Sequence, residues 1–227
     1  MPTLSVADGF EQSGTATSPP YSAIAGSPAI ITHPVYSGNR ALEIVTAVAE
    51  YVQYDVGASQ RIVTTSFYIQ LLAIPVAAVD FARFVNASGN KAFQFDTGTG
   101  KFRVSDASSV AGGPTLVTNK WYLVDLEADS SANPHITRCM IDGGTEFSVS
   151  NAIAASDTTS MRMGTPNAEA VNALYDDWAI SITDGDYPIG PHAFGPRATS
   201  SIPYAPTATV PSTAVAFDMF RQITGKA

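Results

Sequence analysis

Apolar and polar residues alternate with a period of two through most of the chain between residues 40 and 182. In KWYLVDLEAD, for example, Tyr122, Val124, Leu126 and Ala128 fall on one face of the segment. The same alternation marks RALEIVT, YVQYDV, RIVTTSFYIQLL, VDFARFVN, KAFQFD, KFRVS, HITRCMIDGG, TEFSVS, SMRMG and ALYDDWAISI. A period of two is that of a β-strand, and no long stretch before residue 190 has helical periodicity. About ten short strands separated by turn signals predict an all-β fold, a two-sheet antiparallel jelly-roll sandwich.

Glycine-rich turns join two pairs of these segments into predicted hairpins. TGTG lies between KAFQFD and KFRVS, and Gly143 and Gly144 end the segment HITRCMIDGG directly before TEFSVS. In VDFARFVN, strict alternation would place Phe81, Arg83 and Val85 on one face. Residues 12–38 are rich in Ser, Pro, Gly and Thr and are expected to form loops. The sandwich domain is expected to span residues 1–190.

The chain changes character after residue 190. Prolines recur at short intervals, which blocks both a sheet ladder and a helix, so residues 191–227 are expected to form an extended arm. Apolar residues near its end have the i, i+3, i+4, i+7 spacing of a short amphipathic helix. This helix either folds back on its own domain or docks on a partner or a symmetry mate. The candidate docking residues are Pro203, Tyr204, Pro206, Ala216, Met219, Phe220 and Ile223.

Composition narrows the classes of partner. Charged residues make up 14% of the chain and the net charge is −8, with Lys and Arg scattered. The lack of a basic stripe argues against nucleic-acid binding. The most apolar window, residues 67–85, is interrupted by polar residues and proline, so no membrane span is expected. One cysteine allows no internal disulfide, and the N-terminus lacks the features of a signal peptide, which favours synthesis in a cytoplasm.

No catalytic motif is evident. The three histidines, His33, His135 and His192, are not beside a nucleophile motif, and both G-x-S-x-G and H-E-x-x-H are absent. A glycosidase pattern of the type Glu-x-Asp-x-x-Glu begins at Glu127 but fails because position 132 is Ala. Cys139 shares one strand face with Thr137 and Ile141 and is expected to be a small core residue. The chain is therefore predicted not to be an enzyme.

Two adjacent acids, Asp176 and Asp177, precede Trp178 in the last predicted strand. Strict alternation places Asp176 on the core face with Trp178, and Asp177 on the other face. A carboxylate that points inward needs hydrogen bonds or a cation, and Ca²⁺ prefers oxygen ligands. Asp8 and Glu11, in ADGFEQSG near the N-terminus, would lie close to this pair if the first and last strands are neighbours.

Several short motifs resemble the concanavalin A-like, LamG-like jelly-roll domain, most closely the version found in tailed-bacteriophage virion proteins. They are DGFE, WYLVDLEAD with ITRCMIDGGTEF, and YDDWAISITDGDYPIG, over residues 5–190. The matching positions are Trp121, Asp142, Gly143, Asp176, Asp177, Trp178, Asp186, Tyr187, Pro188 and Gly190.

The resemblance implies a structural calcium site. In related sugar-binding modules, an N-terminal Phe-Glu and a late Asp-Asp pair help to hold calcium. Residue by residue, this points to Glu11 with Asp176 or Asp177, and to Asp8 as a further candidate. No other acidic ligand is evident, so backbone carbonyls would complete the shell. The alternative is that Asp176 accepts hydrogen bonds from backbone amides and no metal binds.

Two functions from different classes follow. The resemblance implies a virion structural protein, a head or tail accessory or decoration module that is assembled in the host cytoplasm. Its expected partners are capsid or tail proteins, further copies of itself and host-surface glycans. The alternative is a carbohydrate-binding module without a virion role, and a glycan hydrolase or lyase is disfavoured by the missing motif. The candidate glycan-binding residues are Tyr36, Tyr51, Tyr54, Asn86 and Asn90, in or near predicted loops.

Overall fold

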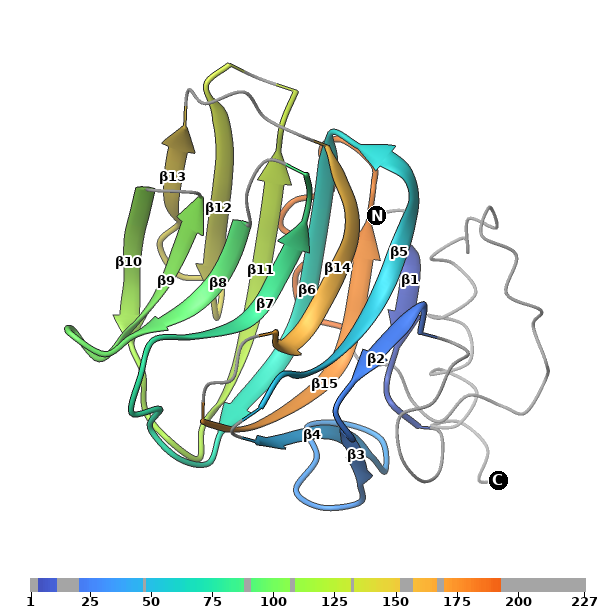
Figure 1. Cartoon of the computed structure of the whole chain (residues 1–227), viewed down its shortest axis with the longest axis vertical. Helices are drawn as coiled ribbons and strands as arrows, with labels where there is room; N and C mark the ends of the chain where they lie inside the picture. Colours follow the sequence, from blue (N-terminus) through green and yellow to red (C-terminus); the bar gives the residue numbers. More distant parts are fainter. Residues whose placement is uncertain are drawn as a thin grey trace, which may run out of the picture.

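The chain folds into two antiparallel β-sheets that face each other as a sandwich (Figure 1). The structure is a computed structural model, and it describes residues 4–11, 21–46, 48–87, 91–106, 109–131, 133–151, 157–166 and 170–192. These residues form fifteen strands and no helix, and therefore no helix that could cross a membrane. The predicted all-β jelly-roll sandwich is confirmed.

The larger sheet has eight strands. Seven lie in a continuous spatial order: β13 (Phe147–Asn151), β12 (His135–Ile141), β11 (Trp121–Asp129), β6 (Ile62–Leu71), β15 (Val171–Ser181), β4 (Ala41–Thr46) and β3 (Ala29–Ile31). The eighth, β1 (Leu4–Asp8), pairs with β15, so that Asp8 lies opposite Trp178. The first and last strands are therefore neighbours, as the calcium hypothesis required.

The second sheet has seven strands and forms the front layer in Figure 1. Their spatial order is β10 (Ser109–Thr115), β9 (Lys101–Asp106), β8 (Lys91–Asp96), β7 (Val79–Val85), β14 (Thr158–Thr165), β5 (Glu50–Gln60) and β2 (Ala23–Ala25). The predicted hairpins are β8–β9 and β12–β13, and both are confirmed. Strands distant in sequence, such as β7, β14 and β5, become neighbours in this sheet.

Aromatic side chains fill the space between the sheets. Phe93 stacks on Phe102 with ring centroids 5.1 Å apart, and Phe67 and Phe81 meet Phe93 at an angle. Trp178 is fully buried, and its indole N–H donates to Thr65 Oγ1 at 2.8 Å, which satisfies its polar atom. Cys139 is buried in the same core, as predicted.

Four strands lie where the alternation gave no signal. Two of them, β2 and β3, fall within residues 12–38, which were predicted to be loops, and they are only three residues long. A third, β10, contains Gly112, Gly113 and Pro114, which are depleted from strands. It lies at the edge of its sheet, where proline is tolerated because one side of the strand needs no ladder partner. The fourth is β1.

The face assignment in β15 was wrong. Val171, Ala173 and Tyr175 point into the core, and so do Trp178 and Ile180, so the inward parity changes within the strand. The register against β6 slips between residues 176 and 179, and Asp177 has φ 48°. This is a β-bulge, in which one extra residue shifts the alternation by one place. Asp176 therefore lies on the outer face, opposite Tyr68 of β6, and not on the core face with Trp178.

A second bulge changes the faces in β7. The register against β8 slips between Asp80 and Ala82. As a result, Phe81 packs in the core with Ala82 and Phe84, while Arg83 points outward. Strict alternation had grouped Phe81 with Arg83, and that grouping was wrong for the same physical reason.

The predicted arm and its helix lie almost entirely outside the described residues. The described part ends at residue 192, so the boundary at residue 190 and all seven candidate docking residues, Pro203, Tyr204, Pro206, Ala216, Met219, Phe220 and Ile223, stay predictions.

Candidate functional site

Asp8, the first of the predicted calcium ligands, is a buried acid at the end of β1. The hydroxyls of Tyr21 and Tyr54 donate to its Oδ2 at 3.0 and 2.8 Å, and the Phe10 amide donates to Oδ1 at 2.8 Å. These three donors stabilise the carboxylate without a cation. Asp8 thus ties β1 to the interior of the sandwich.

The other three predicted ligands gather around the loop at residues 36–39. Asp176 Oδ2 accepts hydrogen bonds from the amides of Tyr36 and Ser37 at 2.9 and 3.0 Å. Asp177 Oδ2 accepts one from the Ser37 hydroxyl at 2.6 Å. Glu11 Oε1 accepts one from the Asn39 amide at 2.8 Å. The loop therefore connects the N-terminal acid with the late acidic pair.

This arrangement matches the alternative in which Asp176 accepts backbone hydrogen bonds. Among the described residues, no group of three or more His, Cys, Asp and Glu side chains is placed to hold a metal ion. Asp8 accepts bonds from its own set of donors, and the remaining acids are divided between neighbouring residues of the loop. Calcium binding by Asp8, Glu11, Asp176 and Asp177 stays a prediction.

The outer face of the eight-stranded sheet carries further buried acids, which the chain itself covers. Asp125 Oδ1 accepts from the Gly190 amide at 2.9 Å, and Glu127 is bound by Arg138 and Thr64. Burial raises the pKa of the Asp125 and Glu127 carboxyls, and it raises the pKa of Asp176 to about 7. The segment around Gly190 covers Asp125 and the loop at Tyr36 covers Asp176, while Glu127 is closed off by Arg138, so a ligand cannot reach these acids.

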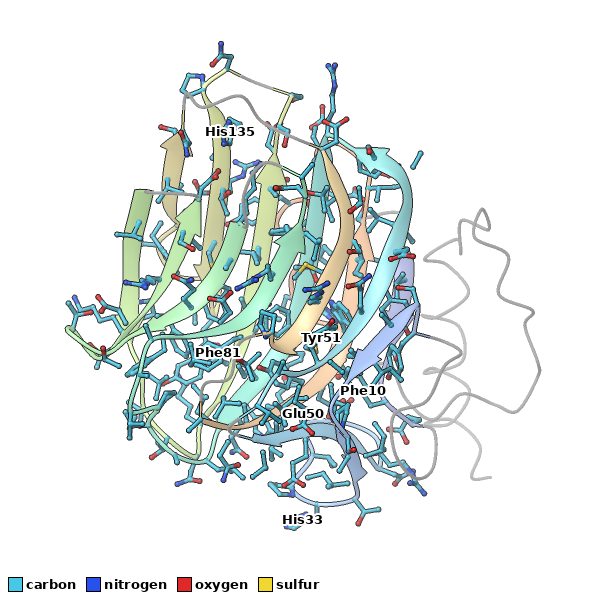
Figure 2. All side chains as sticks on the ribbon, viewed as in Figure 1. Phe10, His33, Glu50, Tyr51, Phe81 and His135 are labelled. Atoms are coloured by element: carbon cyan, nitrogen blue, oxygen red, sulfur yellow. The ribbon has the colours of Figure 1, made fainter. Side chains whose placement is uncertain are left out.

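The predicted glycan-binding residues do not form one site. Tyr36 is 44% exposed and stacks on Tyr68 over the eight-stranded sheet, with ring centroids 3.5 Å apart. Tyr51 lies on the opposite side of the sandwich, on the outer face of the seven-stranded sheet (Figure 2). Tyr54 corrects the prediction, because it is buried in the core against Trp178. Asn86 follows β7 and is half-buried, and Asn90 lies outside the described residues.

The three histidines do not form one site either. Figure 2 shows His33 and His135 at opposite ends of the sandwich. His135 Nε2 lies 3.0 Å from Asp106 Oδ2, and both side chains are buried. The His192 Nε2 lies 2.5 Å from the backbone oxygen of Asp177, where it helps to hold the chain over the outer face of β15.

The outer face of the seven-stranded sheet carries polar side chains on five adjacent strands, from β9 to β5, which form two hydrogen-bonded groups. We call it the polar face. Its members are Tyr51, Gln53, Asp55, Asp80, Arg83, Gln94, Asp96, Arg103 and Arg162. Most of them are half-buried, so they are ordered and still open to solvent. On the eight-stranded sheet, the segment around Gly190 lies across the outer face and is bonded to Asp125. Within the described residues, no segment is bonded across the polar face in this way.

One half of the polar face is built around Asp80. Arg83 forms an ion pair with Asp80 Oδ2, and the Gln94 amide donates to Oδ1 at 2.5 Å. The Arg103 Nε donates to Gln94 Oε1 at 2.9 Å, and its guanidinium lies 3.8 Å from Asp96. Asp80 is therefore held by Arg83 of its own strand and by Gln94 of the next strand, and Gln94 is held in turn by Arg103.

The other half is built around Arg162 on β14. Its Nε donates to Gln53 Oε1 at 2.7 Å, and its guanidinium lies 4.5 Å from the centre of the Tyr51 ring. The Gln53 amide donates to Asp55 Oδ1 at 3.0 Å, and that oxygen also accepts from the Ser22 hydroxyl. These contacts fix the plane of the guanidinium.

Planar amides, guanidinium groups, carboxylates and a tyrosine ring in fixed positions can bind a ligand rich in hydroxyl groups. Each sugar hydroxyl is both a donor and an acceptor, and the polar face offers both kinds of partner across adjacent strands. Because the side chains are already ordered, binding costs little additional side-chain entropy.

Only Tyr51 of this face was among the residues predicted from the sequence. The signal for others was present, since Gln94 and Arg103 alternate with buried Phe and Val in KAFQFD and KFRVS. An arginine or glutamine on the outer side of a strand is ordinary, however. What makes the set distinctive is the strand order, which places β9, β8, β7, β14 and β5 side by side.

No protein-family model matches the chain, and no curated protein matches it. Solved structures with a similar fold are found. The cellulose induced protein Cip1 is 13% identical with a TM-score of 0.55, and the match covers 78% of this chain and 97% of that one. A sialidase is 15% identical with a TM-score of 0.55, over 81% of this chain and 19% of the sialidase.

A third similar structure is the Trypanosoma rangeli sialidase in complex with sialic acid. It is 10% identical with a TM-score of 0.50, over 68% of this chain and 27% of the sialidase. The chain thus spans less than a third of either sialidase. At these identities the likeness shows the fold alone, a β-sandwich of the jelly-roll type.

These neighbours correct the prediction that the chain is not an enzyme. Sialidases are enzymes, and they are among the proteins in which this sandwich occurs. The lack of a familiar catalytic motif is therefore no argument against enzymatic activity in this chain.

Proposed function

We propose that the domain binds a carbohydrate polymer across the polar face of the seven-stranded sheet. The observation that carries this proposal is the set of hydrogen-bonded, mostly half-buried polar side chains on five adjacent strands. A structural role alone does not require such an array on an outer face, where water can solvate each group separately. A polymer that lies across the strands would contact several members of the array in turn.

The fold neighbours support this proposal. One of them is a sialidase in complex with sialic acid, and another is described as induced by cellulose. The names of these two proteins mention sugars, and the polar face offers groups that could recognise a sugar. The predicted concanavalin A-like, LamG-like resemblance points to the same class of ligand.

A glycan array tests this function, with purified full-length protein and two kinds of variant. Gln94→Ala and Tyr51→Ala each remove a contact from the polar face, so we expect the affinity for the bound glycan to fall by about tenfold. Tyr36→Ala, on the opposite side of the sandwich, should leave the affinity unchanged. The polymers that bind are then assayed for chain cleavage, because the fold occurs in sialidases.

Two outcomes would reject the polar face as the site. One is the absence of binding to every glycan on the array. The other is loss of binding in Tyr36→Ala with full binding in both polar-face variants, which would move the site to the stacked pair Tyr36 and Tyr68.

The finer proposal, a phage head or tail accessory protein, is supported by the sequence resemblance and by the Pro-rich arm at residues 191–227. If the arm docks on the particle, its deletion should leave the sandwich folded and prevent incorporation into particles. Electron microscopy of particles assembled with the truncated protein measures this. Particles that incorporate it normally would contradict the docking role.

A further inference from the structure

We infer that the carbohydrate bound by the polar face is acidic, and that Arg162 is its anion contact. This inference rests on the proposed function and names the class of ligand. It concerns a polysaccharide whose sugars carry carboxylate or sulfate groups, in contrast to a neutral glycan.

Two arginines of the polar face lie directly opposite each other. Arg83 on β7 pairs with Arg162 on β14 in the ladder between these strands. Like charges at opposite positions of neighbouring strands destabilise a sheet unless each is neutralised. The counter-ion of each arginine therefore determines whether its charge is already neutralised or can attract an anionic ligand.

Arg83 has its counter-ion within the face, and Arg162 does not. Arg83 is paired with Asp80. Among the described residues, no carboxylate lies within 4.0 Å of the Arg162 guanidinium, whose described contacts are Gln53 and the Tyr51 ring. Arg162 is thus a half-buried cation whose described direct contacts are neutral. An anionic ligand would supply the charge that Asp80 supplies to Arg83.

The contacts of Arg162 also orient it for this task. Only its Nε is used by Gln53, at 2.7 Å, while the Tyr51 ring holds the guanidinium in position. A guanidinium binds a carboxylate or sulfate through two parallel N–H groups, and a fixed plane reduces the entropy lost on binding. Gln53 in turn donates to Asp55, which fixes the position of the amide that binds Arg162.

The number of unpaired cations separates a polysaccharide from a nucleic acid. On the polar face, Arg83 and Arg103 lie beside Asp80 and Asp96, and among the described residues Arg162 has no carboxylate partner. A phosphate backbone needs several cations in a row. A polysaccharide with one acid on each sugar needs only a local contact, and its hydroxyls can bind Gln94 and Gln53.

The test compares acidic polysaccharides with their own carboxyl-reduced forms. Polygalacturonate, alginate, hyaluronate and polysialic acid are immobilised beside the reduced forms, with chondroitin sulfate beside its desulfated form, cellulose and galactan as neutral polymers, and a single-stranded oligonucleotide. We expect binding to at least one acidic polymer, about tenfold tighter than to its neutral form. Arg162→Gln should remove this difference, and Arg162→Lys should restore part of it because the charge remains without the planar fork.

Lys120→Gln is the matched control, because Lys120 is an exposed cation next to β11 of the other sheet. It should bind like the wild type. A melting curve for each variant shows whether it is folded. If Arg162→Gln does not fold, the test rests on Arg162→Lys, which should show a smaller preference for the acidic polymer than the wild type.

The outcomes separate this inference from the function on which it rests. If only neutral polymers bind, or if acidic and reduced forms bind equally, the proposal that the polar face binds carbohydrate stands. The inference that the carbohydrate is acidic is then wrong. Equal binding by wild type and Arg162→Gln would remove Arg162 as the anion contact. Binding of the oligonucleotide alone, or of nothing on the panel, would overturn both.

Discussion

Deletion of Asp177 is expected to prevent the domain from folding. The residue is the extra one in the β15 bulge, and the inward parity of the strand changes across it. Without it, the strand can keep only one of its two halves in register with the core. Either Val171, Ala173 and Tyr175 would turn outward, or Trp178 and Ile180 would.

The expected loss is large because these side chains are fully buried. Removing a buried Trp from a core costs about 3 to 5 kcal/mol, and removing a buried Ile costs about 2 to 5 kcal/mol. Together these approach the whole stability of a typical domain, roughly 5 to 15 kcal/mol. Circular dichroism and a melting curve of the purified deletion variant would show the loss of the cooperative transition.

Asp177→Asn is the matched control for this deletion. Asparagine adopts positive φ more readily than most residues, and its side-chain oxygen can accept the hydrogen bond from Ser37. This variant should melt close to the wild type. A deletion variant with an unchanged melting temperature would show that the bulge is not needed for the register of β15.

The bulges also explain which parts of the fold could be predicted from the sequence. Alternation identified the long strands, among them β6 and β11, because a period of two is a local property of each segment. It assigned the wrong faces to Asp176 and Phe81, since a bulge shifts the alternation by one residue and leaves no local signal at a non-glycine position. The short strands β2 and β3 carry too few residues for a period to be seen.

The candidate site was harder to predict, for a different reason. Arg83, Arg162 and Gln53 come from three strands that lie apart in the sequence, and only the strand order brings them together. Many topologies are compatible with the same set of strands. The acidic pair at 176–177 was conspicuous because its members are adjacent in sequence, and the structure divides them by a bulge and covers them with the loop at Tyr36.

The stability of the domain is expected to fall as the pH rises from about 5 to about 8, because of Asp176. Burial is the largest cause that raises the pKa of this carboxyl from 3.8 to about 7, and the amides of Ser37 and Tyr36 oppose the shift. Between these two pKa values the Asp176 carboxyl of the folded protein holds a proton that the unfolded chain has released. The contribution of the protonated Asp176 to the free energy of unfolding is therefore fully present below about pH 4 and is lost as the pH rises through 7. The free energy of unfolding falls by about 4 kcal/mol over this range.

Asp176→Asn should flatten this dependence. An amide does not titrate, although it also cannot accept at both side-chain positions, so the variant is expected to be less stable than the wild type at low pH and to lose less stability as the pH rises. The slope of stability against pH is therefore the quantity to compare, from chemical unfolding in the presence of EDTA. Asp184→Asn, at an exposed turn, should keep the wild-type slope, and an equal slope in Asp176→Asn would show that Asp176 is not the titrating group.

The same measurement with calcium in place of EDTA tests the predicted metal site. A cation binds the ionised carboxylates, so bound calcium would stabilise the folded state more as the pH rises. The wild-type slope would then be reduced or reversed by calcium, and Asp176→Asn would lose this response. If the slope is the same in calcium and in EDTA, the hydrogen bonds from the loop at residues 36 and 37 hold Asp176 without a metal ion.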